Sequence, residues 1–215
     1  MCIVIFVEVI QMINSLDEIK KNYYLNNLCI KDTSQIENAA IVIRSIMFMH
    51  KFLMDNKLPK DIEASICRNI IIDSYSVIEN AVVCLAYKMQ SKCLQCTHQC
   101  KHRSNSLWSK NNEHANVMKA FDNADRYLKE TGIINLTKDA KTFYEDYRKS
   151  RNNVHLTRNA EIITKDDQFT IKNCEISIDF MRKLFQVMSS NYQEFARCNC
   201  LLNQNMKGKI IQRGK

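Results

Sequence analysis

Apolar residues recur every three or four positions through most of this chain, the spacing of a helix that is buried on one side. The pattern predicts one long helix over about residues 35–56, a second from Asp61 to about Met89, and a last one from Asn173 to about Arg197. Only a short loop containing Pro59 separates the first two, so we expect an antiparallel helical hairpin. The predicted inner faces are Ile36, Ala40, Ile43, Met47 and Met54 on the first helix, Ile66, Ile70, Val77, Ile78, Ala81, Leu85 and Met89 on the second, and Ile176, Phe180, Leu184, Val187 and Met188 on the last.

Short polar signals indicate where helices begin and end. Residues 15–18 and 34–37 both have the Ser-x-x-Glu spacing of a capping box, and the second precedes the first long helix. A further helix is expected over about 113–131, with Gly132 as its C-terminal stop. Thr137 can cap the helix that follows it.

Two stretches interrupt the helical period. Residues 91–112 are polar, rich in Cys and His, and predicted to be a loop or insertion. Residues 161–171 alternate around a polar turn and predict one small β-hairpin before the last helix. We therefore expect an all-α fold with three parts: an N-terminal lead-in over 1–33, one helical domain over 34–197, and a basic C-terminal tail over 198–215.

Glycine and proline are scarce, with 3 Gly and 1 Pro in 215 residues. P-loops, dinucleotide-binding turns and nucleophile elbows all need glycines at fixed positions. Gly132, Gly208 and Gly214 cannot supply them, so those phosphate-binding and hydrolase architectures are excluded. The same scarcity favours long helices with short turns.

The N-terminal stretch indicates a cytoplasmic protein with no membrane segment. Residues 1–13 are apolar, of strand or helix type, contain Glu8, lack a basic region, and are too short to span a bilayer. Thiols stay reduced in the cytosol, so the 10 cysteines are not expected to form structural disulfides. Four of them lie among apolar neighbours and are predicted to be small core residues: Cys29, Cys67, Cys84 and Cys174.

Four polar residues near the middle of the second half share one helical face. At about 100° per residue, Arg148, Arg151, Asn152 and His155 fall within about a third of a turn. Guanidinium groups hold phosphate bidentately, and imidazole moves protons near neutral pH. The formal net charge of +8 also suits an anionic partner, either nucleic acid or an acidic protein. The alternative is a basic stripe on a solvated helix, with His155 in a structural role.

This motif resembles that of the HEPN superfamily. Arg148-x6-His155 fits the R-x4–6-H pattern, and Arg151-Asn152 resembles the RN form common there, although Arg151-x3-His155 is one residue short. The resemblance covers about residues 34–197 and implies a compact HEPN-like helical bundle with a long leading hairpin. Many members are metal-independent ribonucleases that need no cofactor and work as homodimers with one composite cleft.

The resemblance also implies roles for individual residues. His155 would act as acid or base at the ribose 2′-OH or the leaving 5′-oxygen, and Arg148 or Arg151 would bind the scissile phosphate. Asn152 would orient the phosphate or the imidazole. An acidic residue on the second helix, Asp73 or Glu79, would support the arginine, unless both are ordinary solvated carboxylates.

The polar stretch contains a second candidate site. Cys93, Cys96, Cys100 and His102 have donor types and close spacing that suit a structural zinc ion. A second well-separated pair is missing unless Cys198 and Cys200 fold back, so loop thiols and redox pairing remain alternatives.

Two functions follow from these patterns. The first is an RNA-cleaving HEPN-type enzyme in a toxin–antitoxin or antiviral defence setting, with an antitoxin or defence protein as partner. The second is a non-catalytic helical module that binds RNA, a nucleotide or a protein.

Overall fold

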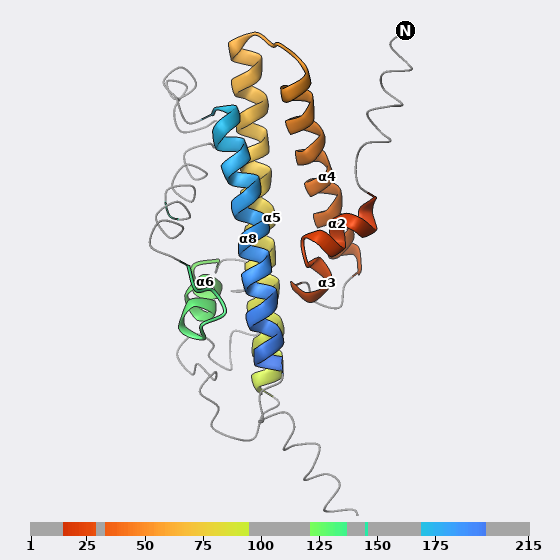
Figure 1. The fold of residues 1–215 in the computed structure, drawn as a ribbon. Coiled ribbons are helices and arrows are strands. Elements are labelled where there is room, and N and C mark those ends of the chain that lie inside the picture. The colour runs from red at the N-terminus through yellow and green to blue at the C-terminus, as the bar shows by residue number, and fades with distance from the viewer. Residues whose placement is uncertain (1–14, 29–32, 95–120, 137–144, 146–168, 197–215) are drawn as a thin grey trace, which may run out of the picture.

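The computed structural model describes residues 15–28, 33–94, 121–136, 145 and 169–196, and every regular element in these ranges is an α-helix. The elements are α2 (Leu16–Asn22), α3 (Leu25–Leu28), α4 (Thr33–Asp55), α5 (Lys60–Leu94), α6 (Phe121–Glu130) and α8 (Ile171–Ala196). Figure 1 shows α5 and α8 running side by side in the same direction, with α4 antiparallel to them. The all-α prediction is confirmed for the described part of the chain.

The predicted hairpin is formed by α4 and α5, but α5 is longer than expected. It spans 35 residues and continues to Leu94, whereas the sequence pattern predicted a loop from residue 91. Ser91 and Lys92 are polar but break no helical hydrogen bond, and the helix contains neither Gly nor Pro. Polarity at these positions therefore did not mark the end of the helix.

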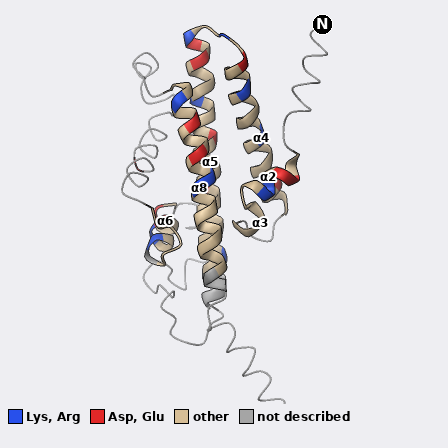
Figure 2. Cartoon of the chain, in the orientation of Figure 1, with Lys and Arg blue, Asp and Glu red and all other residues tan. Residues whose placement is uncertain are grey.

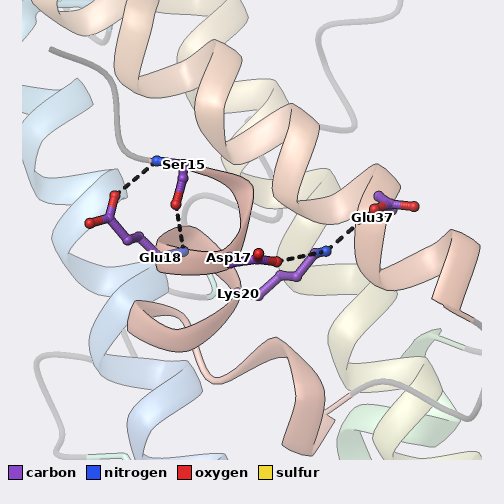
Figure 3. A network of polar contacts seen from close by, with 5 residues as sticks. All are labelled: Ser15, Asp17, Glu18, Lys20 and Glu37. Carbon is purple, nitrogen blue, oxygen red and sulfur yellow. Dashed lines mark hydrogen bonds and ion pairs between the residues drawn. The ribbon is translucent and has the colours of Figure 1, made fainter. Parts of the chain in front are cut away.

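Of the four helix N-caps predicted within the described residues, one is confirmed and three are wrong by two or three residues. The Ser15 backbone N–H donates to Glu18 Oε2 at 2.9 Å and the Glu18 N–H donates to Ser15 Oγ at 3.2 Å, which is the predicted capping box (Figure 3). By contrast, Ser34 and Asp61 lie inside the first turns of α4 and α5. The third is Asn173, whose N–H donates to Thr170 Oγ1 at 3.2 Å, so Thr170 caps α8.

That cap also bears on the predicted β-hairpin. Residues 169–171, expected at the end of its second strand, are instead the capping segment and the first residue of α8. The remainder of the hairpin lies outside the described residues and stays a prediction. The side chain of Phe169 is partly buried against the hydrophobic core, which explains its apolar character without a strand.

Gly132 ends α6 as predicted, in a Schellman arrangement. Its φ is +77°, and its N–H donates to Lys129 O at 3.1 Å while the Ile133 N–H donates to Leu128 O at 2.9 Å. Leu128 and Ile133 are both buried, at the two positions where this motif commonly has an apolar pair. The Asn191 side chain on α8 donates to Gly132 O and Ile133 O at 3.2 and 3.0 Å, which ties the turn to the bundle.

The core lies around α5, which packs against α4, α6 and α8. The predicted inner face of α5 is confirmed, with Ile66 partly buried and the other six residues buried. Two predictions on neighbouring helices are wrong, because Met54 is 56% exposed at the end of α4 and Ile176 is 38% exposed on α8. Other residues of these helices are buried instead: Ile46 and Leu53 on α4, and Cys174, Met181 and Phe185 on α8.

By length and composition, residues 60–89 of α5 could cross a lipid bilayer. In the fold, 61% of the most apolar window of this segment is buried against other helices. A central core helix passes the same test, so the apolar character of α5 is accounted for by packing on three neighbouring helices.

Candidate functional site

Arg148, Arg151, Asn152 and His155 lie outside the described residues, so their common face stays a prediction. The nearest described residue is Glu145, which is helical and exposed. A helix at this point agrees with the one expected after Thr137.

Asp73 and Glu79, the candidate supporting carboxylates, both lie on α5 and are partly buried. Six positions apart on a helix, they point about 120° away from each other. The exposed residues of this part of α5, which include Asn69, Ser76 and Asn80, lie between those two directions. Asp73 and Glu79 therefore occupy opposite margins of one narrow exposed stripe.

The two carboxylates differ in their surroundings. Burial raises the pKa of Asp73, and no cation pairs with it within the described part of the chain. Glu79 does have an interaction partner. It is also the only charged residue between Asp73 and Lys88, in a part of α5 where the ribbon of Figure 2 is mostly coloured tan, for uncharged residues. A carboxylate retained in such an apolar segment needs polar compensation, which the interaction partner of Glu79 supplies.

The cysteine cluster is divided between described and undescribed residues. Cys93 lies in the last turn of α5 and therefore on a helix, which corrects its placement in a loop. Cys96, Cys100 and His102 lie outside the described residues, and the zinc site stays a prediction. Within the described ranges, no group of three Cys, His, Asp or Glu residues could hold a metal ion.

Two buried thiols meet between α5 and α8. Cys67 and Cys174 are fully buried, and Cys174 Sγ donates to Cys67 O at 3.5 Å. Burial raises the pKa of both thiols, and in Cys174 the neighbouring Cys67 adds to the effect. Both stay protonated and serve as small core residues, as the sequence predicted for them and for Cys84.

Polar contacts that the sequence did not reveal hold the short α3 helix in place. The Lys88 ammonium on α5 donates to Asn27 O at 3.0 Å and lies 4.8 Å from the centroid of the Tyr192 ring on α8. The Asn27 side chain donates to Ser189 Oγ at 2.9 Å. The two hydrogen bonds join residues 61 and 162 positions apart in sequence, and no local pattern signals their meeting. We read the cluster as structural.

One further contact links α4 to α8. His50 Nε2 lies 3.8 Å from Glu175 Oε1, an ion pair only when the imidazole is protonated. The His50 Nε2 atom is buried, and it neither donates nor accepts a hydrogen bond within the described structure.

No protein-family model, curated protein or solved structure matches this chain. The HEPN resemblance therefore rests on the motif at 148–155 and on the helical context around α4 and α5.

Proposed function

We propose that this protein is a metal-independent endoribonuclease of the HEPN type. The observation that carries the proposal is the spacing of Arg148, Arg151, Asn152 and His155, which places phosphate-binding and proton-transferring groups on one helical face. The all-α character of the described chain and its long α4–α5 hairpin support it. The net charge of +8 suits RNA as substrate.

The chemistry needs only these side chains. His155 takes the proton from a ribose 2′-OH, whose oxygen then attacks the adjacent phosphorus. The P–O5′ bond breaks, and a protonated imidazole donates its proton to the leaving 5′-oxygen. An arginine holds the phosphate and offsets its growing negative charge. The products carry 2′,3′-cyclic phosphate and 5′-hydroxyl ends. Since one chain carries one His155, a homodimer would supply acid and base together.

Glu79 is the residue we assign to support the arginine. It is the lone charge in an apolar segment of α5 and it has an interaction partner, while burial without a described cation makes Asp73 the weaker choice. Glu79→Gln removes the charge and keeps the shape. We expect this variant to lower RNA cleavage with little change in folding.

The decisive experiment is RNA cleavage by purified protein in EDTA. General acid–base catalysis contributes about 10²–10⁴-fold, and we expect a loss of that order in His155→Ala. Arg148 and Arg151 are each replaced by Ala in the same assay. The phosphate ligand is the arginine whose replacement causes a loss as large as that of His155→Ala. Lys149→Ala is the matched control, because it removes a neighbouring positive charge from a different helical face.

Three outcomes separate the alternatives. Cleavage in EDTA that depends on His155, with cyclic phosphate ends, supports the enzyme. RNA binding without cleavage supports a non-catalytic binding module. Both RNA-directed functions are excluded if the protein does not bind RNA and the His155→Ala variant does not differ from the wild-type protein in these assays. The cellular setting we propose, toxin–antitoxin or antiviral defence with a protein partner, depends on the first outcome.

A further inference from the structure

The face of α4 that points away from α5 carries an unexpected row of apolar side chains. Ile41 is 45% exposed and Phe52 is 41% exposed, and Phe48 between them is partly exposed. With the small, exposed Ser45, they are spaced by four, three and four residues, which places them in one stripe along the helix. We call Ile41, Ser45, Phe48 and Phe52 the outer stripe of α4.

The outer stripe is distinct from the other exposed apolar residues. Met54 and Ile62 lie beside the α4–α5 loop and Ile176 lies on α8, where helix ends and edges leave side chains uncovered. The outer stripe instead runs along the 23-residue helix α4 for about 17 Å, at 1.5 Å per residue from Ile41 to Phe52, which lies in the last turn. A row of large apolar side chains of this length is typical of a surface that another segment covers.

The chain itself supplies a segment of matching chemistry. Residues 1–13 are apolar except for Glu8 and Gln11, and they lead directly into α2. That helix packs on α4, where Lys20 Nζ lies 3.3 Å from Glu37 Oε1, close to the start of the outer stripe (Figure 3). Thirteen residues span about 20 Å as a helix and more as a strand, so in either form the segment is at least as long as the stripe.

The N-terminal segment and the edge of the outer stripe also carry charges of opposite sign. Glu8 is the only charged residue among the first 16, and it lies near the middle of the apolar segment. Arg44 lies at the edge of the outer stripe between Ile41 and Phe48, is exposed, and makes no ion pair with any described residue. A segment lying on the stripe can bring this carboxylate and this guanidinium together.

We infer that residues 1–13 dock on the outer stripe of α4 and complete the hydrophobic layer of the bundle on that side. The N-terminal segment is then part of the helical domain and not a separate lead-in. This inference is independent of RNA cleavage, because it involves neither Glu79 nor the motif at 148–155.

Photo-crosslinking in the full-length protein tests the inference directly. Ser45 is replaced by p-benzoyl-phenylalanine, a photoreactive residue, and the crosslinked peptide is identified by mass spectrometry. We expect an intrachain crosslink to residues 1–13. Asn69, exposed on α5, is the matched control position and is expected to give no crosslink to this segment. A crosslink between two chains, to another segment of the same chain, or none at all overturns the inference.

A second variant gives an independent measurement. Phe52→Glu places a charge in the outer stripe at an exposed position, so the core should stay folded by circular dichroism. We expect thermolysin to cut within residues 1–13 on the order of tenfold faster, the factor that about 1.4 kcal/mol of lost contact corresponds to. Ser76→Glu, at an exposed position of α5, is the control and should leave cleavage unchanged. Equal cleavage in both variants contradicts docking, and if Phe52→Glu does not fold, the crosslink decides.

Discussion

Asp73 can be placed on its helix from the sequence, but its contribution to the free energy of folding cannot be predicted in that way. Its position on the second long helix was evident from the periodicity, and the HEPN resemblance then implied that it is a candidate partner for an arginine. The fold adds that it is half-buried and that burial raises its pKa, with no compensating cation in the described part of the chain. A carboxylate in this state is a cost to folding at neutral pH.

This leads to a prediction for stability against pH. A carboxyl whose pKa is raised on folding binds its proton more tightly in the native state, so its unfavourable contribution is fully present at neutral pH and disappears below its ordinary pKa of 3.8. We expect Asp73→Asn to raise the melting temperature at pH 7 by on the order of 1–2 °C. The gain should shrink toward zero as the pH falls to about 3.5 in thermal scans. A lower melting temperature at pH 7 would instead mean that Asp73 is paired.

Individual elements were predicted with uneven success, and the reasons differ. The helices α4, α5 and α8 were expected from their apolar period, and Ser15 and Gly132 correctly marked ends because each acts through its own backbone neighbours. The end of α5 and the cap of α8 were wrong. Several residues near those ends were chemically able to cap or break a helix, and only the packing of the whole helix selects among them.

Gly132 allows the strongest test at this scale. Its φ of +77° is unfavourable for residues with a side chain, and a Cβ there would meet no atom within 4 Å. The cost of Gly132→Ala is therefore conformational alone, and we expect about 1 kcal/mol of lost stability in urea unfolding. Gly132→Asn is the control and should cost less, because Asn adopts this conformation more readily. Equal losses in the two variants would contradict the conformational explanation.

At the scale of the whole molecule, α5 holds the fold together. It packs against α4, α6 and α8, so every long described helix depends on the same buried side chains. The contacts that attach α3, through Asn27, Lys88 and Tyr192, also converge on α5 and α8. We therefore expect the described helices to unfold as one cooperative unit.

Leu85→Ala tests this expectation. Leu85 is fully buried on α5, and its truncation leaves a cavity that typically costs about 2–5 kcal/mol. Circular dichroism and tyrosine fluorescence should report a single, coincident transition at a lower denaturant concentration. Asn69→Ala, at an exposed position of the same helix, should change stability by less than about 0.5 kcal/mol. Separate transitions for the two probes would show that the helices do not form one unit.

The sequence by itself determined that this protein is helical, where its hairpin lies, and which side of α5 is buried, because these follow from local periodicity and from the absence of residues that break helices. It also supplied the motif on which the proposed RNA cleavage rests. Only the tertiary structure decided that Met54 and Ile176 are exposed, that Asp73 lacks a described partner while Glu79 has one, and that α4 carries an apolar outer stripe. Those properties depend on what lies opposite each side chain, and the identity of that neighbour is set by residues far away along the chain.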